Sequence, residues 1–345
     1  MKRVQVFLSQ TLGPIIAHLS AQIGKEVRLD ETVLDRSDSL NLAPPGCISP
    51  NGACRLIKTR DAWLAFNLPR AEDLDDIPVL LSILFASLGK GEHDPESFKP
   101  NVWDALERNA PNFPSDVLLE QALLFGLAVA KVGETPPPAH PCAASHITTR
   151  VESRRKLRVI DFSNLWAGPL CASVFAALGA EVVKLEAVGR PDTTAKSQPL
   201  LDKRLNGAKQ RLQIELASSS DRANFPAHIG DADILVTNMP ARSAANFSLV
   251  PETLLKEKPN LIWIAITGHG WNQNRIAFGD DAAASGGLVE RKDEAPHFIG
   301  DAIADPLTGL AAAAAALELI ADNKAGFIDA SLAHTAAFAA HGAEH

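Results

Sequence analysis

Residues 158–186, RVIDFSNLWAGPLCASVFAALGAEVVKLE, constrain the fold more than any other stretch of this chain. A strand-like segment is followed by a turn with Gly168 and Pro169, a helix of small residues and a second strand-like segment, EVVKLE. A strand–helix–strand unit of about thirty residues is the building block of a parallel sheet covered by helices. The turn after the first strand lies at the carboxyl edge of such a sheet, where open α/β sheets bind ligands. We therefore expect the functional site at this edge.

The same alternation continues through the second half of the chain. Strand patterns occupy 157–162, 181–186, 211–216, 233–238, 261–267 and 326–330. Helical patterns occupy 169–178, 218–228, 251–257 and 306–321. This order predicts a doubly wound, mostly parallel, Rossmann-like α/β domain.

A proline-rich stretch precedes this domain. Residues 133–150, GETPPPAHPCAASHITTR, contain three consecutive prolines, which favour an extended backbone and do not fit inside a packed helix. We therefore predict a smaller α+β domain over 1–135, a linker over 136–154 and the Rossmann-like large domain over 155–345.

The predicted smaller domain contains both strand and helix patterns. Residues 1–45 have helical periodicity, and the segments CRLIKT and AWLAFNL form a hairpin-like pair of strands. The run VLLSILFASLG predicts a helix that ends at Gly89. Two more helical patterns lie in 101–132, the second with Ser115 as its N-cap.

Composition and charge exclude several functions. The formal charge of -8 argues against a nonspecific nucleic-acid binder, which needs a basic surface. No apolar run reaches the roughly 20 residues that span a bilayer, and polar residues interrupt the N-terminal apolar patches that a secretory signal needs. The four cysteines form no CxxC pair and no zinc-spaced cluster with histidines, as is typical of reduced thiols. We expect a cytoplasmic protein with no metal site, no membrane span and no nucleic-acid partner.

The loop SNLWAGP does not fit a dinucleotide. A pyrophosphate at this position needs the pattern G-x-G-x-x-G, and only Gly168 is present. A nicotinamide-dependent oxidoreductase is therefore disfavoured. On the residues alone, a turn with proline at the first helical position is the better explanation of Gly168 and Pro169.

The stretch VIDFSNLWAGPLCASVFAALGAEVVKLEAVGRPD resembles the opening of the class III CoA-transferases, which include formyl-CoA transferase, carnitine CoA-transferase and α-methylacyl-CoA racemase. That family opens with V-L-D-x-[ST]-x-x-x-A-G-P and a helix ending L-G-A-[ED]-V-[IV]-K-[IV]-E. Further similar blocks follow in the family's order: NGAKQRLQIEL, DADILVTNMP, NLIWIAITGHG, FIGDAIADPLTGLAAAAAALELI and GFIDASL. The resemblance covers 155–335 and implies a Rossmann-like large domain.

The resemblance assigns the nucleophile to Asp305, in the block that carries the family's catalytic aspartate. Asp305-Pro306 before an alanine-rich run also predicts a helix N-cap, whose amides and dipole hold a carboxylate ionised. In the family this aspartate attacks an acyl-CoA thioester, and the acid exchange passes through an aspartyl-CoA thioester. An acyl-CoA and a carboxylic acid are therefore the implied partners, and coenzyme A is a substrate rather than a cofactor.

Seven more residues are candidate contacts for the acyl-CoA: Trp166, Ala167, Gly168, Lys209, Asn238, Gly268 and Gly270. Trp166 would form a wall of the acyl pocket, with plain packing as the alternative. Lys209 and Asn238 would contact the nucleotide or phosphates of CoA, and an ordinary surface lysine is the alternative for Lys209. Amides of the glycines in 268–270 or 286–287 would bind the developing oxyanion.

Two other functions stay open. The racemase branch uses a histidine from a G-H-D element, but the corresponding AFGDDAAASGG has none, and a loop residue such as His269 is more often structural. A transferase is therefore favoured over a racemase. A non-catalytic CoA-binding paralogue is the other alternative, because N-M-P replaces the family's N-F-R-P. Family members form interlocked dimers, so a homodimer is also implied, and the order of domains here is permuted or belongs to one half of a fused pair.

Overall fold

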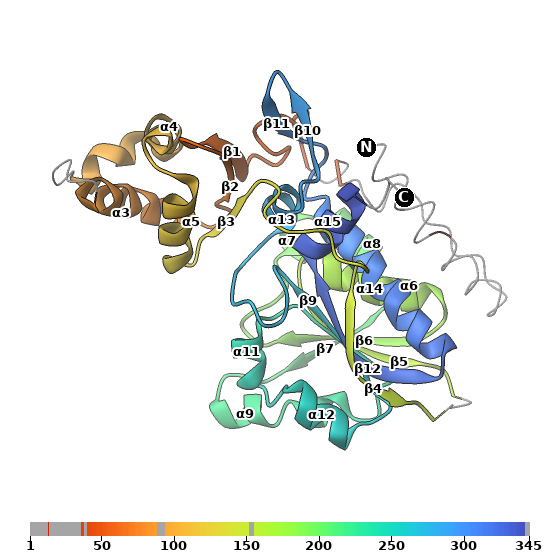
Figure 1. The fold of residues 1–345 in the computed structure, drawn as a ribbon. Helices are drawn as coiled ribbons and strands as arrows, with labels where there is room; N and C mark the ends of the chain where they lie inside the picture. The colour runs from red at the N-terminus through yellow and green to blue at the C-terminus, as the bar shows by residue number, and fades with distance from the viewer. Residues whose placement is uncertain (1–12, 14–35, 38–39, 88–93, 152–154, 342–345) are drawn as a thin grey trace.

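We describe the fold from a computed structural model, which places residues 13, 36–37, 40–87, 94–151 and 155–341. A seven-stranded sheet lies at its centre (Figure 1), with strand order β4-β12-β9-β8-β5-β6-β7. The strands are β4 Ala143–Thr149, β5 Arg158–Phe162, β6 Glu181–Ala187, β7 Gln210–Ile214, β8 Ile234–Thr237, β9 Ile262–Thr267 and β12 Lys324–Ser331. All neighbours pair in parallel except β4, which is antiparallel to β12. The six predicted strands are all present, so the large, mostly parallel sheet is confirmed.

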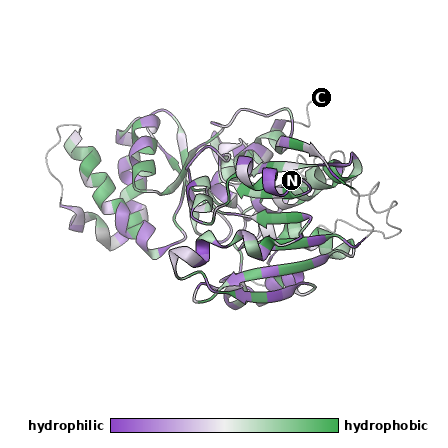
Figure 2. Cartoon of the chain, turned by 90° about the horizontal axis from the view of Figure 1, so that it is seen from below, coloured by the Kyte–Doolittle hydropathy of each residue, from purple (hydrophilic) through white to green (hydrophobic). Residues whose placement is uncertain are grey.

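Helices cover both faces of this sheet. One face carries α6 Ala167–Ala177, α8 Pro199–Asn206, α13 Gly279–Ser285, α14 Ala304–Ala321 and α15 Leu332–His341. The other carries α9 Ser219–Ala223, α10 Pro226–Ile229, α11 Ala241–Ala245 and α12 Pro251–Glu257. Alternate strand residues enter the two hydrophobic clusters: Ile262 and Ile264 face the first, and Trp263 faces the second. The inner strands are largely hydrophobic (Figure 2), as expected when both faces of a parallel sheet are buried.

Helix α14 has the length and hydropathy of a membrane span, but its place in the fold is that of a core helix. The 18-residue helix has a mean hydropathy of 1.4, and 67% of it is buried inside the protein. It packs against α6, α15 and β12. Its small side chains allow this close packing. At Gly309 no side chain fits at all, because an added Cβ would lie 2.5 Å from the carbonyl oxygen of Ala167.

Two helix predictions need correction. The segment 218–228 is not one helix but two short ones, α9 and α10, separated by Asn224 and Phe225. Ser115 is not an N-cap but the first residue of α5 Ser115–Leu124, and Pro114 precedes it. The amide of Ser115 donates to the Asp61 carboxylate at 2.8 Å, so a distant side chain replaces the local cap.

The first half of the described chain forms a three-stranded antiparallel sheet of β1 Cys54–Lys58, β2 Trp63–Asn67 and β3 Ala128–Lys131. The helices α3 Ala71–Ser87, α4 Val102–Asn109 and α5 pack on it around a separate hydrophobic cluster. The predicted hairpin is present as β1 and β2. Short 3-10 helices at Pro95–Asn101 and Ala110–Asn112 connect the helices. Most of the helical pattern expected over 1–45 lies outside the described residues.

The predicted linker over 136–154 contains β4, a strand that the sequence did not indicate. Strand β4 pairs with β12, with Ala144 opposite Ile328. Nearly all of its residues are exposed. Its sequence has neither an apolar run nor the alternation that predicts a strand. The linker therefore supplies an edge of the large sheet, while the domain boundaries themselves stay a prediction.

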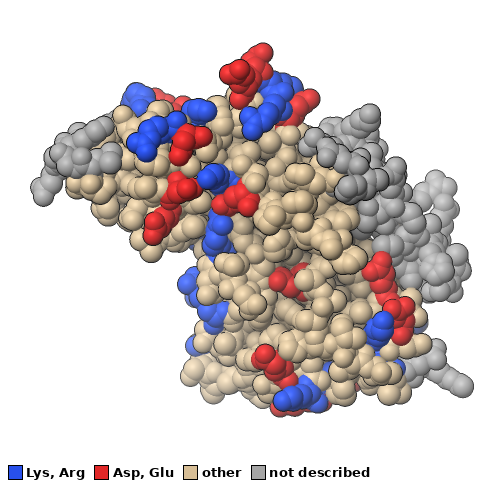
Figure 3. Space-filling model, in the orientation of Figure 1, with Lys and Arg blue, Asp and Glu red and all other residues tan. Residues whose placement is uncertain are grey.

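The small elements α7 Thr194–Ser197, β10 Val289–Lys292 and β11 Ala295–Phe298 complete the fold. Strands β10 and β11 form an antiparallel hairpin between α13 and α14. Acidic and basic side chains are interspersed on the face shown in Figure 3, and much of the surface between them is uncharged.

Candidate active site

The loops after three parallel strands meet at a cavity of about 270 Å³, called here the first cavity. The loop after β5 contributes Asn164, Leu165 and Ala167, the loop after β8 contributes Asn238, Met239 and Pro240, and the loop after β9 contributes Thr267, Gly268, Gly270 and Trp271. Asp305 of α14 also lines this cavity. The structure thus brings the predicted residues Ala167, Asn238, Gly268, Gly270 and Asp305 together at the carboxyl edge of the sheet.

A second cavity of about 280 Å³ adjoins the first. Both cavities are lined by Leu165, Phe278 and Asp305. The second cavity is also lined by residues from the first half of the chain, including Arg36 and Asn51. Asp305 therefore lies between two cavities, one at the sheet edge and one against the N-terminal part of the chain.

Asp305 lies in the first turn of α14, which begins at Ala304, so it is not the predicted N-cap. Its pKa is raised to about 7, chiefly because burial removes water from the carboxylate. Arg36 and the amide of Gly279 lower this pKa, whereas the charges of Asp280 and Asp301 raise it. The expectation that the helix terminus holds Asp305 firmly ionised is therefore wrong, because burial and like charges outweigh the favourable groups. The carboxyl group titrates near neutral pH.

Glycine at position 279 allows α13 to approach this carboxylate. A Cβ added there would lie 2.5 Å from Asp305 Oδ2 and 2.3 Å from the carbonyl oxygen of Ala302. No side chain fits at such distances, so glycine is required for the contact between the two helices. This approach also brings Asp280, the next residue of α13, to the wall of the second cavity.

Asp280 belongs to a network that joins the two halves of the chain. The Asn51 side-chain amide donates to Asp280 at 2.9 Å and to Asp301 at 2.7 Å. Arg36 makes a two-pronged contact with Asp301, through Nε and, at 3.0 Å, through Nη2. In the part of the chain that the structure describes, no group of three or more His, Cys, Asp or Glu side chains is arranged to hold a metal ion. The contacts of Arg36 and Asn51 neutralise and orient the Asp280 and Asp301 carboxylates.

A comparison with known proteins identifies the family. The family model described as CoA-transferase family III matches residues 155–343. The chain belongs to this family. Succinyl-CoA:mesaconate CoA-transferase of Haloarcula hispanica is 30% identical over 175 residues, 45% of this chain and 44% of that protein. Formyl-CoA:oxalate CoA-transferase of Afipia carboxidovorans is 26% identical over 166 residues, 45% of this chain and 39% of that protein.

Among solved structures, the hypothetical protein Rv3272 from Mycobacterium tuberculosis is similar, with a TM-score of 0.48 and 24% identity. The alignment covers 54% of this chain and 56% of that one. This CoA-transferase family III chain spans less than half the length of the two curated relatives above.

Lys209 is not placed to contact a ligand, contrary to the sequence-based expectation. Its ammonium group is fully buried and lies 2.7 Å from Asp161 Oδ2, and it also donates to the carbonyl of Pro169 and to Asn206 Oδ1, both at 2.8 Å. Burial raises the pKa of Asp161, but Lys209 and Lys184 outweigh it and hold that pKa below its ordinary value. Lys209 therefore stabilises the start of α6 from inside the core.

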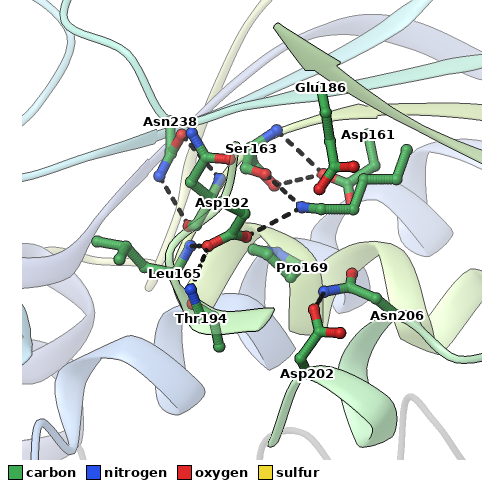
Figure 4. Close-up of polar contacts among 12 residues, drawn as sticks. Asp161, Ser163, Leu165, Pro169, Glu186, Asp192, Thr194, Asp202, Asn206 and Asn238 are labelled. Carbon is green, nitrogen blue, oxygen red and sulfur yellow. Dashed lines mark hydrogen bonds and ion pairs between the residues drawn. The ribbon is translucent and has the colours of Figure 1, made fainter. Parts of the chain in front are cut away.

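Lys184 is also fully buried. It donates to the carbonyl of Ser163 at 2.7 Å and lies 3.2 Å from Asp192. Asp192 in turn accepts from the amides of Leu165 and Thr194. Figure 4 shows that these contacts converge on the loop after β5 and hold this loop in place.

The remaining predicted residues, Asn238, Gly168 and Trp166, lie on or next to the loop after β5. Asn238 donates to the Asn164 carbonyl at 2.9 Å and accepts from its amide at 3.2 Å, so it both lines the first cavity and clamps the loop (Figure 4). Gly168 lines neither cavity, and a Cβ there would lie 2.3 Å from Ser163 Oγ. Trp166 is buried, lines the second cavity and lies 5.0 Å beneath the Arg36 guanidinium.

Of the two glycine segments expected to bind the oxyanion, 268–270 and 286–287, the cavity geometry favours the first. Gly268 and Gly270 line the first cavity, whereas Gly286 and Gly287 line neither. Gly286 instead packs on α15, where an added Cβ would lie 2.4 Å from the amide nitrogen of Ala337. His269 is buried with a pKa lowered to about 3, chiefly by loss of water, and lines neither cavity.

Sequence reasoning missed Asp280, Arg36 and Asn51. The doublet Asp280-Asp281 stands in the sequence AFGDDAAASGG, where the family resemblance draws attention only to the absence of a histidine. No local signal pointed to Asn51, because its partner Asp280 is 229 residues away in the chain.

Proposed function

We propose that this chain transfers coenzyme A between an acyl-CoA thioester and a carboxylic acid, with Asp305 as the covalent nucleophile. The position of Asp305 between two adjoining cavities supports this proposal most directly. The first cavity lies at the ligand-binding edge of the sheet and would hold the thioester end of CoA, with Asn238 beside it. The second cavity would hold the acyl group and, later, the acceptor acid.

The reaction balances with no further reactant. The Asp305 carboxylate attacks the thioester carbon and the carbon–sulfur bond breaks. CoA departs as the thiolate, and a mixed anhydride of Asp305 and the acyl group remains. The thiolate then attacks the aspartyl carbonyl, which releases the first acid as its carboxylate and leaves an aspartyl-CoA thioester. The acceptor carboxylate attacks this thioester and forms a second anhydride. The returning thiolate takes the new acyl group and regenerates the Asp305 carboxylate.

Each of these attacks places negative charge on a carbonyl oxygen near Asp305. The loop of Gly268 and Gly270 lines the cavity on that side, and its amides are the proposed oxyanion donors. The loop is fixed from behind, because the Gly268 carbonyl accepts from the amide of Ala333 at 3.0 Å and from Ser331 Oγ at 3.2 Å. The homodimer and the cytoplasmic location stay predictions.

Intact-mass measurement tests the covalent mechanism. Incubation with an acyl-CoA and no acceptor acid should add the mass of CoA less one water, and hydroxylamine should convert the modified residue to a hydroxamate on the peptide that contains Asp305. Binding of acyl-CoA with no adduct would indicate the alternative, a non-catalytic CoA-binding paralogue. The racemase alternative gains no support, because His269 lines neither cavity.

The rate of adduct formation should follow the ionisation of Asp305. Only the carboxylate attacks, and its pKa is raised to about 7 by burial. The single-turnover rate should therefore fall about tenfold per pH unit well below that value and level off above it. Rapid-quench mass measurement across this range checks the prediction, and a rate independent of pH between about 5 and 8 would contradict it.

A further inference from the structure

The second cavity carries a carboxylate that the proposed reaction does not use. Asp280 is almost fully buried and lines this cavity together with Asp305. One of its oxygens accepts from the amide of Ala302 at 2.6 Å and the other from Asn51 at 2.9 Å. A carboxylate offers about four acceptor positions. Asp280 therefore keeps acceptor capacity for a group bound in the cavity.

The positive charge beside it is already committed. Arg36 is the cation among the described residues that line the second cavity. Its guanidinium is bound by Asp301, donates to Gln198 at 3.3 Å and stacks over Trp166. A ligand carboxylate would have to displace Asp301 to form the same two-pronged contact. Asp301 therefore offsets much of the attraction that Arg36 would exert on an additional anion.

A bound acceptor acid directs its own carboxylate at Asp305, so its other end lies in the rest of the second cavity. A hydroxyl or ammonium group there can donate to Asp280. A second carboxylate there meets a like charge in a buried site, where repulsion is much less screened than in water. Because Arg36 and Asp301 largely neutralise each other, the remaining charge of Asp280 discriminates between the two kinds of tail.

Resting on the proposed transferase activity, we propose that the second cavity selects carboxylic acids whose tail bears a hydrogen-bond donor over acids whose tail bears a second carboxylate, and that Asp280 determines this selection. The proposed substrates are short carboxylic acids that carry a hydroxyl or amino group at the end remote from the carboxylate. Asn51 and Arg36 position the carboxylates that carry out the selection, so the N-terminal part of the chain contributes directly to specificity.

Matched acceptors of nearly equal size test the proposal. With one acyl-CoA donor, kcat/KM for 4-hydroxybutyrate should exceed that for succinate by about tenfold or more, since a like-charge contact costs several kcal/mol. The pair 5-hydroxypentanoate and glutarate should show the same preference. Equal rates, or a preference for the dicarboxylates, would overturn the proposal while leaving the transferase function intact. Failure of every acid, with no aspartyl adduct, would overturn the transferase function and this inference with it.

Variants locate the selection. Asp280→Asn keeps the shape of the side chain and removes its charge, so the preference should fall to about threefold or less. The matched control is Asp281→Asn, a buried neighbour on the same helix that lines neither cavity and should keep the preference. An unchanged preference in Asp280→Asn would contradict the role of this residue. If that variant fails to fold, the two acceptor pairs still decide the proposal in the unmodified protein.

Discussion

The Asp305→Asn variant is expected to lose CoA transfer by a factor of about 10⁴ or more, because a side-chain amide does not attack a thioester. The replacement keeps the size of the side chain and removes a buried carboxyl group that titrates near pH 7. Binding of acyl-CoA should therefore survive, since both cavities keep their shape. The measurement is the rate of acyl exchange, together with an intact mass that shows no CoA adduct.

The control for this experiment is the neighbouring Asp281→Asn variant, which should still form the adduct. Asp281 is buried and accepts from Asn67 at 2.8 Å and from the amide of Phe278 at 2.9 Å, and an asparagine oxygen can accept both bonds. A circular dichroism spectrum that matches the unmodified protein establishes that Asp305→Asn is folded. Transfer within tenfold of the unmodified rate in folded Asp305→Asn would rule out the aspartyl mechanism.

The parallel strands of the large sheet were predictable because local sequence patterns mark them. Most of the parallel strands are short and largely apolar, such as 262–267, and are separated by helices, whereas the edge strand β7 is polar. These signals depend on neighbours in sequence, so the sequence alone carries them. Strand β4 escaped because it is an exposed edge strand, and nothing in its composition distinguishes it from a linker.

The candidate site was predictable only where a loop follows a strand. Asn238 and Gly268 line the same cavity, because the carboxyl ends of parallel strands share one edge, while their roles in binding stay predictions. Asp305 was placed by the family resemblance, but its ionisation was misjudged, because its charged neighbours come from other parts of the chain. The contact of Arg36 with Asp301, for instance, joins residues 265 positions apart. Such contacts follow from tertiary packing and leave no spacing to find.

Lys209 shows the same limit for a buried charge, and it carries the largest stability effect that we expect. A lysine in a polar segment indicates a surface position, yet this ammonium group is fully buried against Asp161. Lys209→Met should lower the free energy of unfolding by about 3–5 kcal/mol, because it leaves the Asp161 carboxylate buried without its main partner. Urea unfolding monitored by circular dichroism measures the change.

Two comparisons separate the buried pair from a general effect of losing a cation. Arg211→Met removes the partly exposed contact of Arg211 with Asp202 and should cost about 1 kcal/mol or less. The double variant Asp161→Asn with Lys209→Met should recover much of the stability lost in Lys209→Met, because no uncompensated charge is then buried. The recovery should be incomplete, since Ser163 and Lys184 also depend on Asp161 for their arrangement. A Lys209→Met variant as stable as the unmodified protein would show that Lys209 does not stabilise the start of α6.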